Sequence, residues 1–389
     1  MALDFRERAA KLGHSLDQLD AGIPVVTTTT INNIDDLKSL LMMWDMPSRQ
    51  GEGILLFEGI PLPPSSDQTY EAILRRVNEF IFNGGILSES DRQTIAVAFP
   101  MQVGTSSYPD FTPDKPVIYN TQPFKPEIIN AGTLTLNQGI YISAYQTPLT
   151  IFCDNFVRNG TSGVKGDINI LGATGTTGIV GYQPGQAGGG GQDGSGNGIQ
   201  GQPGATGGTG GNGNPGQPSM PAKITITTAI SGTNPKITIY TCSGTGGNGG
   251  TGGTGGQGGV GGPGRNATYW GCDCHNNGGN AGMGGVGGNG GKGGDGVPGI
   301  NAAGNITVFI PSNTYKDNII PVKTEAPGGG AGAGGAKAGG GPPGSAGASC
   351  KNCSGGNGNV SGPPGSTGGT GNASTVKGKY ADIIINPLH

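Results

Sequence analysis

Glycine dominates the second half of this chain, and in long stretches it recurs with a period of three residues. Three glycine-rich runs span roughly residues 172–216, 244–304 and 327–372. Between Gly244 and Gly264 every third residue carries a side chain, and all the others are glycine. The residues with side chains are Thr245, Asn248, Thr251, Thr254, Gln257, Val260 and Pro263. Such a segment cannot build a hydrophobic core of its own, so any order in it must come from the main chain.

A three-residue period matches the polyproline-II helix, which rises about 3.1 Å per residue and contains no internal hydrogen bonds. When most residues are glycine, such helices can lie side by side and pair their N–H and C=O groups with one another. A flexible Gly/Ser spacer has no reason to keep this register over seven triplets. We therefore expect a bundle of polyglycine-II helices; a disordered spacer and a collagen-like triple helix are the alternatives.

The segments between the glycine runs have the β-branched, alternating pattern of strands. In "KITITTAI" and "KITIYT" isoleucine alternates with threonine, and "SGTNP" between them predicts a turn that pairs the two strands. Further strands are predicted in "GTLTLNQGIYIS", "LTIFC", "GDINIL", "NITVFI" and "KYADIIIN". The expected fold class is mainly β or irregular. It is a bundle of polyglycine-II helices anchored on short strands, which form one sheet or a sandwich, with a small α-helical N-terminal domain.

The N-terminal part has a more conventional composition and predicts helices. The first twenty residues form an amphipathic helix candidate, and Asn33 can cap a second helix that begins at Ile34. A third helix, starting at Ser66 or Asp67 and ending at Gly84, has a continuous apolar stripe. That stripe consists of Ile73, Leu74, Val77, Phe80 and Ile81.

Two other N-terminal stretches predict extended structure. "EGILLFEGIPLPP" predicts a strand or connector, and "FPMQVGTSSYPDFTPDKPVIYNTQPFKPE" predicts a proline-punctuated linker or an extended wrap over a neighbour. These features divide the chain into three regions. Residues 1–125 form a helical docking or assembly domain with a Pro-rich linker, 126–171 a strand region, and 172–389 the glycine-rich platform with interleaved strands.

All six cysteines occur from residue 153 onward, and an even number beside a weak core favours disulfides. The disulfide candidates are Cys153, Cys242, Cys272, Cys274, Cys350 and Cys353. The spacing leaves the pairing open, because six cysteines allow fifteen connectivities. Free thiols are one alternative. The other is a zinc site drawn from Cys272, Cys274, His275, Cys350 and Cys353, but its CxC spacing is tight for zinc and we expect no metal.

The densest group of side chains in the glycine-rich region is "YWGCDCHNNGG", which interrupts the second run. If the runs form hairpins, this stretch and "ASCKNCSGG" should be turns at the same end. Aromatic side chains on loops of a rigid scaffold suit binding, so this is the candidate binding site. Its residues are Tyr269, Trp270, His275, Asn276 and Asn277. Alternatively, the two aromatic residues simply cap the ends of the glycine segments against solvent.

Runs such as "GGNGGTGGTGGQGG" and "GMGGVGGNGGKGGDG" resemble the glycine-rich distal tail-fibre adhesins of T-even-like phages, which are built on a polyglycine-II sandwich with variable tip loops. The texture is also similar to springtail glycine-rich antifreeze proteins and mycobacterial PE-PGRS proteins. The resemblance covers about residues 160–375, concerns composition and period, and leaves residues 1–125 unmatched. It implies a virion surface protein whose platform presents loops to a host.

Charge and motif content narrow the function classes. The net charge is −3 with no basic run, which argues against a nucleic-acid partner. No catalytic constellation or cofactor motif is recognisable, so we expect no enzyme, no catalytic residues and no cofactor. We also expect no Sec signal peptide, no membrane insertion, and a location on a virion surface or outside the cell.

The predicted function is a non-enzymatic virion or tail-fibre surface protein. Residues 1–125 would bind other copies or structural proteins of an assembly, and the tip would bind a host-surface receptor or glycan. The alternative is a structural subunit of an extracellular filament, sheath or surface layer. Antifreeze activity is a minor third possibility: Thr245, Thr251 and Thr254 share one ridge, but "GMGGVGGNGGKGGDG" does not provide a matching threonine face.

Overall fold

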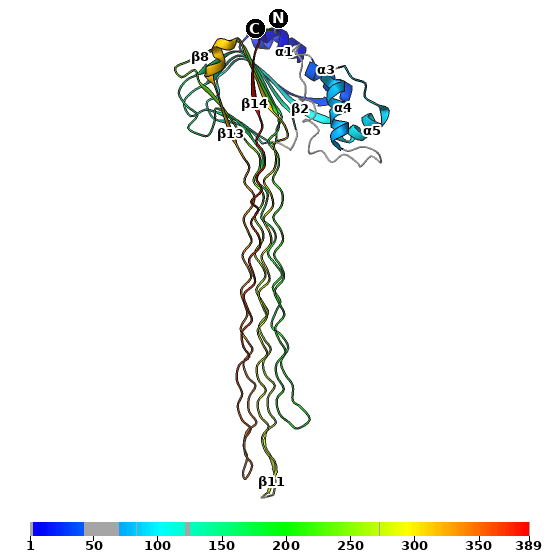
Figure 1. Cartoon of the computed structure of the whole chain (residues 1–389), viewed down its shortest axis with the longest axis vertical. Helices are drawn as coiled ribbons and strands as arrows, with labels where there is room; N and C mark the ends of the chain where they lie inside the picture. Colours follow the sequence, from blue (N-terminus) through cyan, green and yellow to red (C-terminus); the bar gives the residue numbers. More distant parts are fainter. Residues whose placement is uncertain (1–2, 43–69, 83, 121–124, 272, 389) are drawn as a thin grey trace.

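The computed structural model describes residues 3–42, 70–82, 84–120, 125–271 and 273–388. The chain is mainly β. It forms a head with two β-sheets and, projecting from the head, a long narrow shaft (Figure 1). Both chain termini lie at the head, at the far end from the tip of the shaft.

The two sheets of the head are built by a chain that crosses from one to the other after nearly every strand. The seven-stranded sheet has the order β1 (Val25–Ile31), β2 (Met101–Phe111), β4 (Glu127–Leu136), β6 (Leu149–Arg158), β8 (Ala222–Ser231), β12 (Ile306–Ile310) and β14 (Ile383–Pro387). The five-stranded sheet has the order β13 (Ile319–Thr324), β9 (Ile237–Cys242), β7 (Ile168–Leu171), β5 (Ile142–Tyr145) and β3 (Val117–Tyr119). Neighbours are parallel except β1 and β2, which are antiparallel.

The alternation of the strand sequences positions these sheets face to face. Ile151 and Ile224 of the larger sheet and Ile239 of the smaller sheet belong to one buried cluster between them. Neighbouring residues point to the opposite face, where Ile128 and Phe152 join a second cluster with the helices. Since successive side chains of a strand point to opposite faces, the central strands β4, β6, β8 and β12 of the larger sheet are largely buried on both sides.

The turn "SGTNP" does not pair β8 with β9, so the predicted hairpin is wrong. The two strands lie in different sheets, and the turn carries the chain across the sandwich. The physical reason is that the apolar faces of both strands need the same core: Ile224 and Ile226 of β8 meet Ile237 and Ile239 of β9 within it.

Helices cover the outer face of the larger sheet. They are α1 (Phe5–Lys11), α2 (Leu16–Asp20), α3 (Ile34–Met42), α4 (Tyr70–Phe82) and α5 (Glu89–Ile95). The helix expected in this N-terminal stretch is two short helices, α1 and α2, each with its own N-cap, Asp4 and Ser15. In α4, Ile73, Val77, Phe80 and Ile81 are buried as the stripe predicted.

The stretch predicted as a proline-rich linker contains strands instead. β2 and β3 lie within it and pair with β4 and β5, because Met101 and Val103 supply apolar side chains to the cluster under the helices. The predicted extended segment "EGILLFEGIPLPP" lies outside the described residues.

The shaft consists of six extended segments, here called rods, which the chain visits as three hairpins. They span 172–191 (rod 1), 198–217 (rod 2), 243–266 (rod 3), 278–302 (rod 4), 326–349 (rod 5) and 354–378 (rod 6). Rods 1, 3 and 5 lead out of β7, β9 and β13, while rods 2, 4 and 6 return to β8, β12 and β14. Rods 1, 3 and 5 form one layer of the shaft, and rods 2, 4 and 6 form the other. In each layer the rods follow the order of the strands from which they extend, β7-β9-β13 and β8-β12-β14.

Main-chain hydrogen bonds recur at every third residue of each rod. Within one layer, the N–H of Gly249 donates to the carbonyl of Gly330 on the neighbouring rod (2.9 Å). Between layers, the N–H of Gly291 donates to the carbonyl of Gly253 (2.8 Å). Rod 3 contacts rods 1, 2, 4 and 5 in this way, and rod 4 contacts rods 2, 3, 5 and 6. These two rods form the centre of the shaft.

Glycine occupies most positions where the rods face one another, because a side chain there would meet a neighbouring main chain. A Cβ atom added to Gly291 would lie closer than 3.0 Å to backbone carbonyl groups of rod 2, and one added to Gly250 would meet rod 1 in the same way. In rods 3 and 4 the third residue of each triplet points away from the bundle, so Thr251 and Val286 are exposed. This division explains why the sequence alternates two glycines with one side chain.

Asparagine side chains on the outer faces join neighbouring rods. The Oδ1 atom of Asn289 accepts a hydrogen bond from the N–H of Ser366 (2.8 Å), and Asn280 binds the N–H of Asn357 at the same distance. On the opposite face, Asn248 accepts from the N–H of Gly330 (2.7 Å). The main-chain N–H groups of Ser366, Asn357 and Gly330 point outward, away from any carbonyl group of a neighbouring rod. The asparagine side chains accept the hydrogen bonds that water would otherwise accept from these donors.

Candidate functional site

The distal tip of the shaft is a short β-hairpin between rods 3 and 4. It is formed by β10 (Thr268–Trp270) and β11 (Asp273–Asn276), and Trp270 pairs with Asp273 across it. Gly271 in the turn has φ +59°, a left-handed conformation that glycine adopts without strain. The hairpin extends past the end of rods 1 and 2 (Figure 1).

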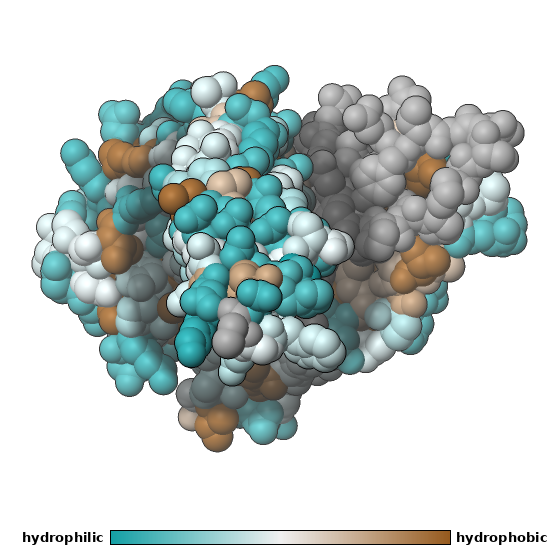
Figure 2. Space-filling model, turned by 90° about the horizontal axis from the view of Figure 1, so that it is seen from below, coloured by the Kyte–Doolittle hydropathy of each residue, from teal (hydrophilic) through white to brown (hydrophobic). Residues whose placement is uncertain are grey.

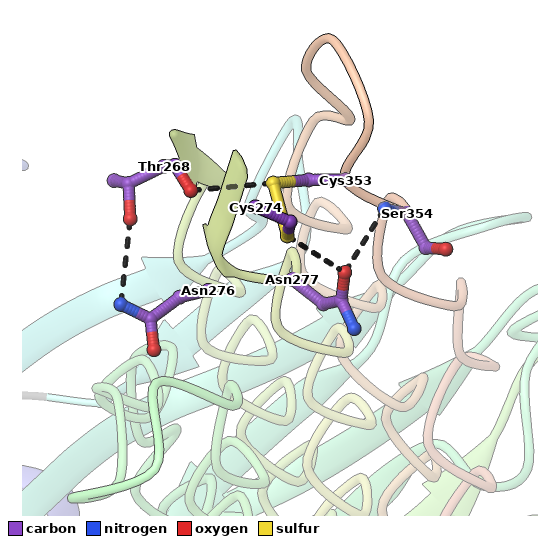
Figure 3. The surroundings of a disulfide bond; sticks show 6 residues. All are labelled: Thr268, Cys274, Asn276, Asn277, Cys353 and Ser354. Atoms are coloured by element: carbon purple, nitrogen blue, oxygen red, sulfur yellow. Dashed lines mark hydrogen bonds between the residues drawn. A yellow bond between two sulfur atoms is a disulfide. The ribbon is translucent and has the colours of Figure 1, made fainter. Parts of the chain in front are cut away.

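A disulfide links this hairpin to the neighbouring tip turn. Cys274 of β11 bonds to Cys353 in the turn between rods 5 and 6, with a Cα–Cα separation of 5.1 Å (Figure 3). The second turn is closed by the N–H of Cys353, which donates to the carbonyl of Cys350 (2.9 Å). The two cysteine-containing stretches are thus turns at the same end of the shaft, as their positions in the sequence predicted.

Polar contacts around the disulfide fix the two turns further. The Oδ1 atom of Asn277 accepts a hydrogen bond from the N–H of Ser354 (3.0 Å). The Nδ2 atom of Asn276 donates to Oγ1 of Thr268 (3.4 Å) and so closes the base of the hairpin (Figure 3). Asn276 and Asn277, which the sequence suggested as binding residues, therefore have structural contacts within the tip.

The aromatic side chains of the hairpin project into solvent. Trp270 is 87% exposed and Tyr269 is 55% exposed, and His275 is exposed as well. A tryptophan that capped the end of a rod against solvent would bury most of its ring on that rod. The exposure of Trp270 therefore disfavours the capping interpretation and leaves the side chain available for contact.

Seen from the tip end, most of the near surface is hydrophilic or neutral, and hydrophobic residues form small, separate patches (Figure 2). Within the described part of the shaft and its tip, the aromatic residues are Tyr182, Tyr269 and Trp270, and all three are exposed. One further patch was missed by the sequence reading. Ile179, Val180 and Tyr182 of rod 1 are 79%, 60% and 75% exposed, and the signal for them was "GIVGYQ", which breaks the glycine texture.

The cysteines follow the prediction only in part. Cys153, Cys242 and Cys350 are free thiols, so the expectation of a disulfide is wrong for these three. Cys153 is buried inside the sandwich, and Cys242 ends β9 with Sγ 3.4 Å from the carbonyl oxygen of Ser243. Cys272 lies outside the described residues.

The disulfide also bears on the zinc alternative, since it uses two of the proposed ligands. Among the residues that the structure describes, no group of three or more His, Cys, Asp or Glu side chains is placed to hold a metal ion. Within the same residues, no helix is both long and apolar enough to cross a membrane.

Comparisons of the chain with protein-family models, with curated proteins and with solved structures find no match.

Proposed function

We propose that the protein is a non-enzymatic virion or tail-fibre surface protein that presents its distal tip to a host surface. The observation that carries this proposal is Trp270: a tryptophan 87% exposed, on a disulfide-linked hairpin at the end of the molecule opposite both termini. In this function residues 1–125 dock onto other structural proteins of an assembly, and the tip binds a receptor or glycan.

We further infer that the six rods are polyglycine-II helices and that they act as a rigid spacer. The support is the three-residue recurrence of the hydrogen bonds, which matches a helix with three residues per turn. At about 3.1 Å per residue, the 24 residues of rod 3 (243–266) span roughly 70 Å. A bonded bundle of that length would hold the tip well clear of the head.

The build of the tip suits binding at low entropic cost. Aromatic side chains supply a large contact area with few rotatable bonds, and a polar end on Tyr269 or Trp270 can add a hydrogen bond. The disulfide and the Asn277 contact already hold the two turns together, so less conformational freedom is lost when a ligand binds.

The alternative of a filament or surface layer would need rods of neighbouring molecules to pack side by side. Side chains at the edge of the shaft oppose this. The hydroxyl of Thr176 on rod 1 accepts a hydrogen bond from Asn214 of rod 2 (2.8 Å), and Ile179 and Tyr182 project from the same rod. A further rod cannot approach closely where Cβ atoms intervene, so the shaft has a finite width.

The test is binding of the labelled full-length protein to candidate host cells and to a glycan panel. The double variant Tyr269→Ala/Trp270→Ala should lose binding at least roughly tenfold, since interface aromatics commonly contribute 2 kcal/mol or more. Tyr182→Ala, which removes a 75% exposed aromatic from the side of the shaft, is the matched control and should bind normally. Undiminished binding of the double variant would reject the tip as the site. Spontaneous fibres in electron micrographs of the purified protein would support the filament alternative.

A further inference from the structure

Within the part of the chain that the structure describes, the two sheets of the head have four edge strands, and three of these edges are protected. An exposed strand edge presents unpaired N–H and C=O groups, and proteins protect such edges with short strands, lysine or proline. Strand β13 carries Pro321 and Lys323, β3 has only three residues, and β14 is short and ends at Pro387. The fourth edge is β1.

Strand β1 has none of these protections. Its sequence, "VVTTTTI", is seven residues long, entirely β-branched, and free of charge and proline. It pairs along its whole length with β2 on one side and is the terminal strand of the sheet among the described residues. Its central residues, 27–30, are exposed, whereas the interior strands of the sheet are largely buried. Long, uncharged edges of high β propensity are sites of strand addition.

We propose that β1 pairs antiparallel with β1 of a second copy of this chain, so that the larger sheets of two molecules become one. The sequence of the strand fits itself. In a two-fold register centred on Thr28, threonine lies opposite threonine through the middle of the strand, and Val25 lies opposite Ile31. Two-fold pairing of one surface with itself is the commonest way in which soluble proteins associate.

The charges near the edge allow this pairing. The strand contributes no charge that would repel its copy. Among the described residues, Lys125 is a cation beside the strand, with Nζ 3.5 Å from Oγ1 of Thr28, and it is paired with Glu127 at 3.3 Å. Strand β1 has no charged group that would favour a partner strand of a different sequence. A second β1 can place threonine opposite threonine on both faces of the joined sheet. We therefore propose a second copy of the chain as the partner of β1.

Dimerisation through β1 does not depend on what the tip binds. It would join two heads and leave both shafts attached to one base. Two tips on one base would bind a repeating surface with higher avidity than one tip, provided that both can reach it.

The test is the mass of the full-length protein in solution, measured by sedimentation velocity and native mass spectrometry over a range of concentrations. We expect a species of twice 38.7 kDa. Thr28→Lys and Thr28→Glu should each weaken the dimer roughly tenfold or more, because like charges then face each other across the two-fold axis. An equimolar mixture of the two variants should dimerise again as the heterodimer. Thr324→Lys, the same change on an exposed threonine of edge strand β13, is the control and should dimerise like the unchanged protein.

Three results would overturn the proposal: a wild type that stays monomeric at every concentration, Thr28 variants that dimerise normally, or a mixture that gives no heterodimer. Hydrogen exchange provides a readout that needs no variant. If β1 pairs with its copy, amides within 25–31 that point away from β2 should be protected at high concentration and exchange rapidly on dilution. Protection that does not change with concentration would exclude a second copy as the partner.

Discussion

The packing of the rods predicts that one methyl group at the centre of the shaft is more damaging than the same methyl group at its surface. Gly291→Ala places a Cβ closer than 3.0 Å to the carbonyl groups of Gly207 and Gly208 on rod 2. Neither is a side chain that could turn away, so the two rods must separate. Separation weakens the bonds that Gly207 and Gly210 donate to rod 4, which are 2.9 and 2.8 Å long.

The magnitude follows from those bonds. A main-chain hydrogen bond contributes about 0.5–1.5 kcal/mol net, and forcing extra volume into a packed interior costs about 1–3 kcal/mol. Gly291→Ala should therefore reduce the free energy of unfolding by about 2–4 kcal/mol. Gly369→Ala is the matched control, because a Cβ there meets nothing within 4 Å. It should be neutral or stabilising by up to about 1 kcal/mol, since alanine restricts the unfolded chain.

One natural alanine in the shaft shows how a rod accommodates an added Cβ atom. Ala338 lies in rod 5, three residues after Gly335 and three before Gly341, and both of these glycines face the bundle. The N–H of Ala338 lies 3.1 Å from its acceptor, whereas those of Gly335 and Gly341 lie 2.8 Å from theirs. A Cβ is thus accommodated by a small local shift in an edge rod. Rod 4 is enclosed by four neighbours and has less room to shift.

The assay is guanidinium unfolding of both variants, with hydrogen exchange followed by mass spectrometry over the shaft and the head. In Gly291→Ala, exchange should accelerate in rods 2 and 4 before it does in the head. If Gly291→Ala were as stable as Gly369→Ala and its amides equally protected, the rods would not be in close contact. Exchange as fast as in an unfolded peptide, in the unchanged protein, would refute bonded rods altogether.

Three further predictions concern the tip, the head and the outer faces of the shaft. Cys274→Ser should destabilise the tip locally by up to roughly 4 kcal/mol, because the disulfide to Cys353 closes a long loop, and it should speed amide exchange within 267–277. Cys153→Ser is the control and should leave amide exchange at the tip unchanged. Burial lowers the pKa of His14, so the folded state binds a proton there less readily than the unfolded state does. The free energy of unfolding should therefore fall as the pH drops below about 6.5, and His14→Gln should reduce this pH dependence in urea titrations between pH 5 and 8. Asn289→Ala should cost about 0.5–1.5 kcal/mol in thermal unfolding, because the N–H of Ser366 loses its acceptor, and equal stability would contradict this role.

The sequence predicted the parts of the fold that depend on local periodicity. The glycine triplets indicated the extended segments, and alternating isoleucines indicated β8, β9 and β12. Strands β1 and β13 were missed, because "VVTTTTI" has no polar and apolar alternation and "IIPVKT" contains a proline. Both are edge strands, which are half solvated, and their sequences follow no burial pattern.

What the sequence could not provide was which rod lies beside which, and at what level. Pairing Cys274 with Cys353 requires rods 4 and 6 to be neighbours in one layer, and the strand order of the head determines that adjacency. Once the rods are placed, a constant offset appears: Asn280 and Asn289 each bind a residue 77 positions later. The disulfide joins cysteines 79 positions apart, close to that offset.

The head can therefore act as the template for the shaft. In the sandwich, Leu171 of β7 pairs with Cys242 of β9, and the next bond along the chain already joins rods 1 and 3: the N–H of Gly172 donates to the carbonyl of Cys242 (3.0 Å). On the returning side, Ile306 donates to Asp382 and Ala302 to Lys379, which continues the ladder between β12 and β14 into rods 4 and 6. Glycine loses more backbone entropy on ordering than any other residue, so an isolated rod would not form. A rod that begins beside a neighbour already held by a strand ladder adds its hydrogen bonds one triplet at a time, and at the far end the disulfide holds two of the hairpins together.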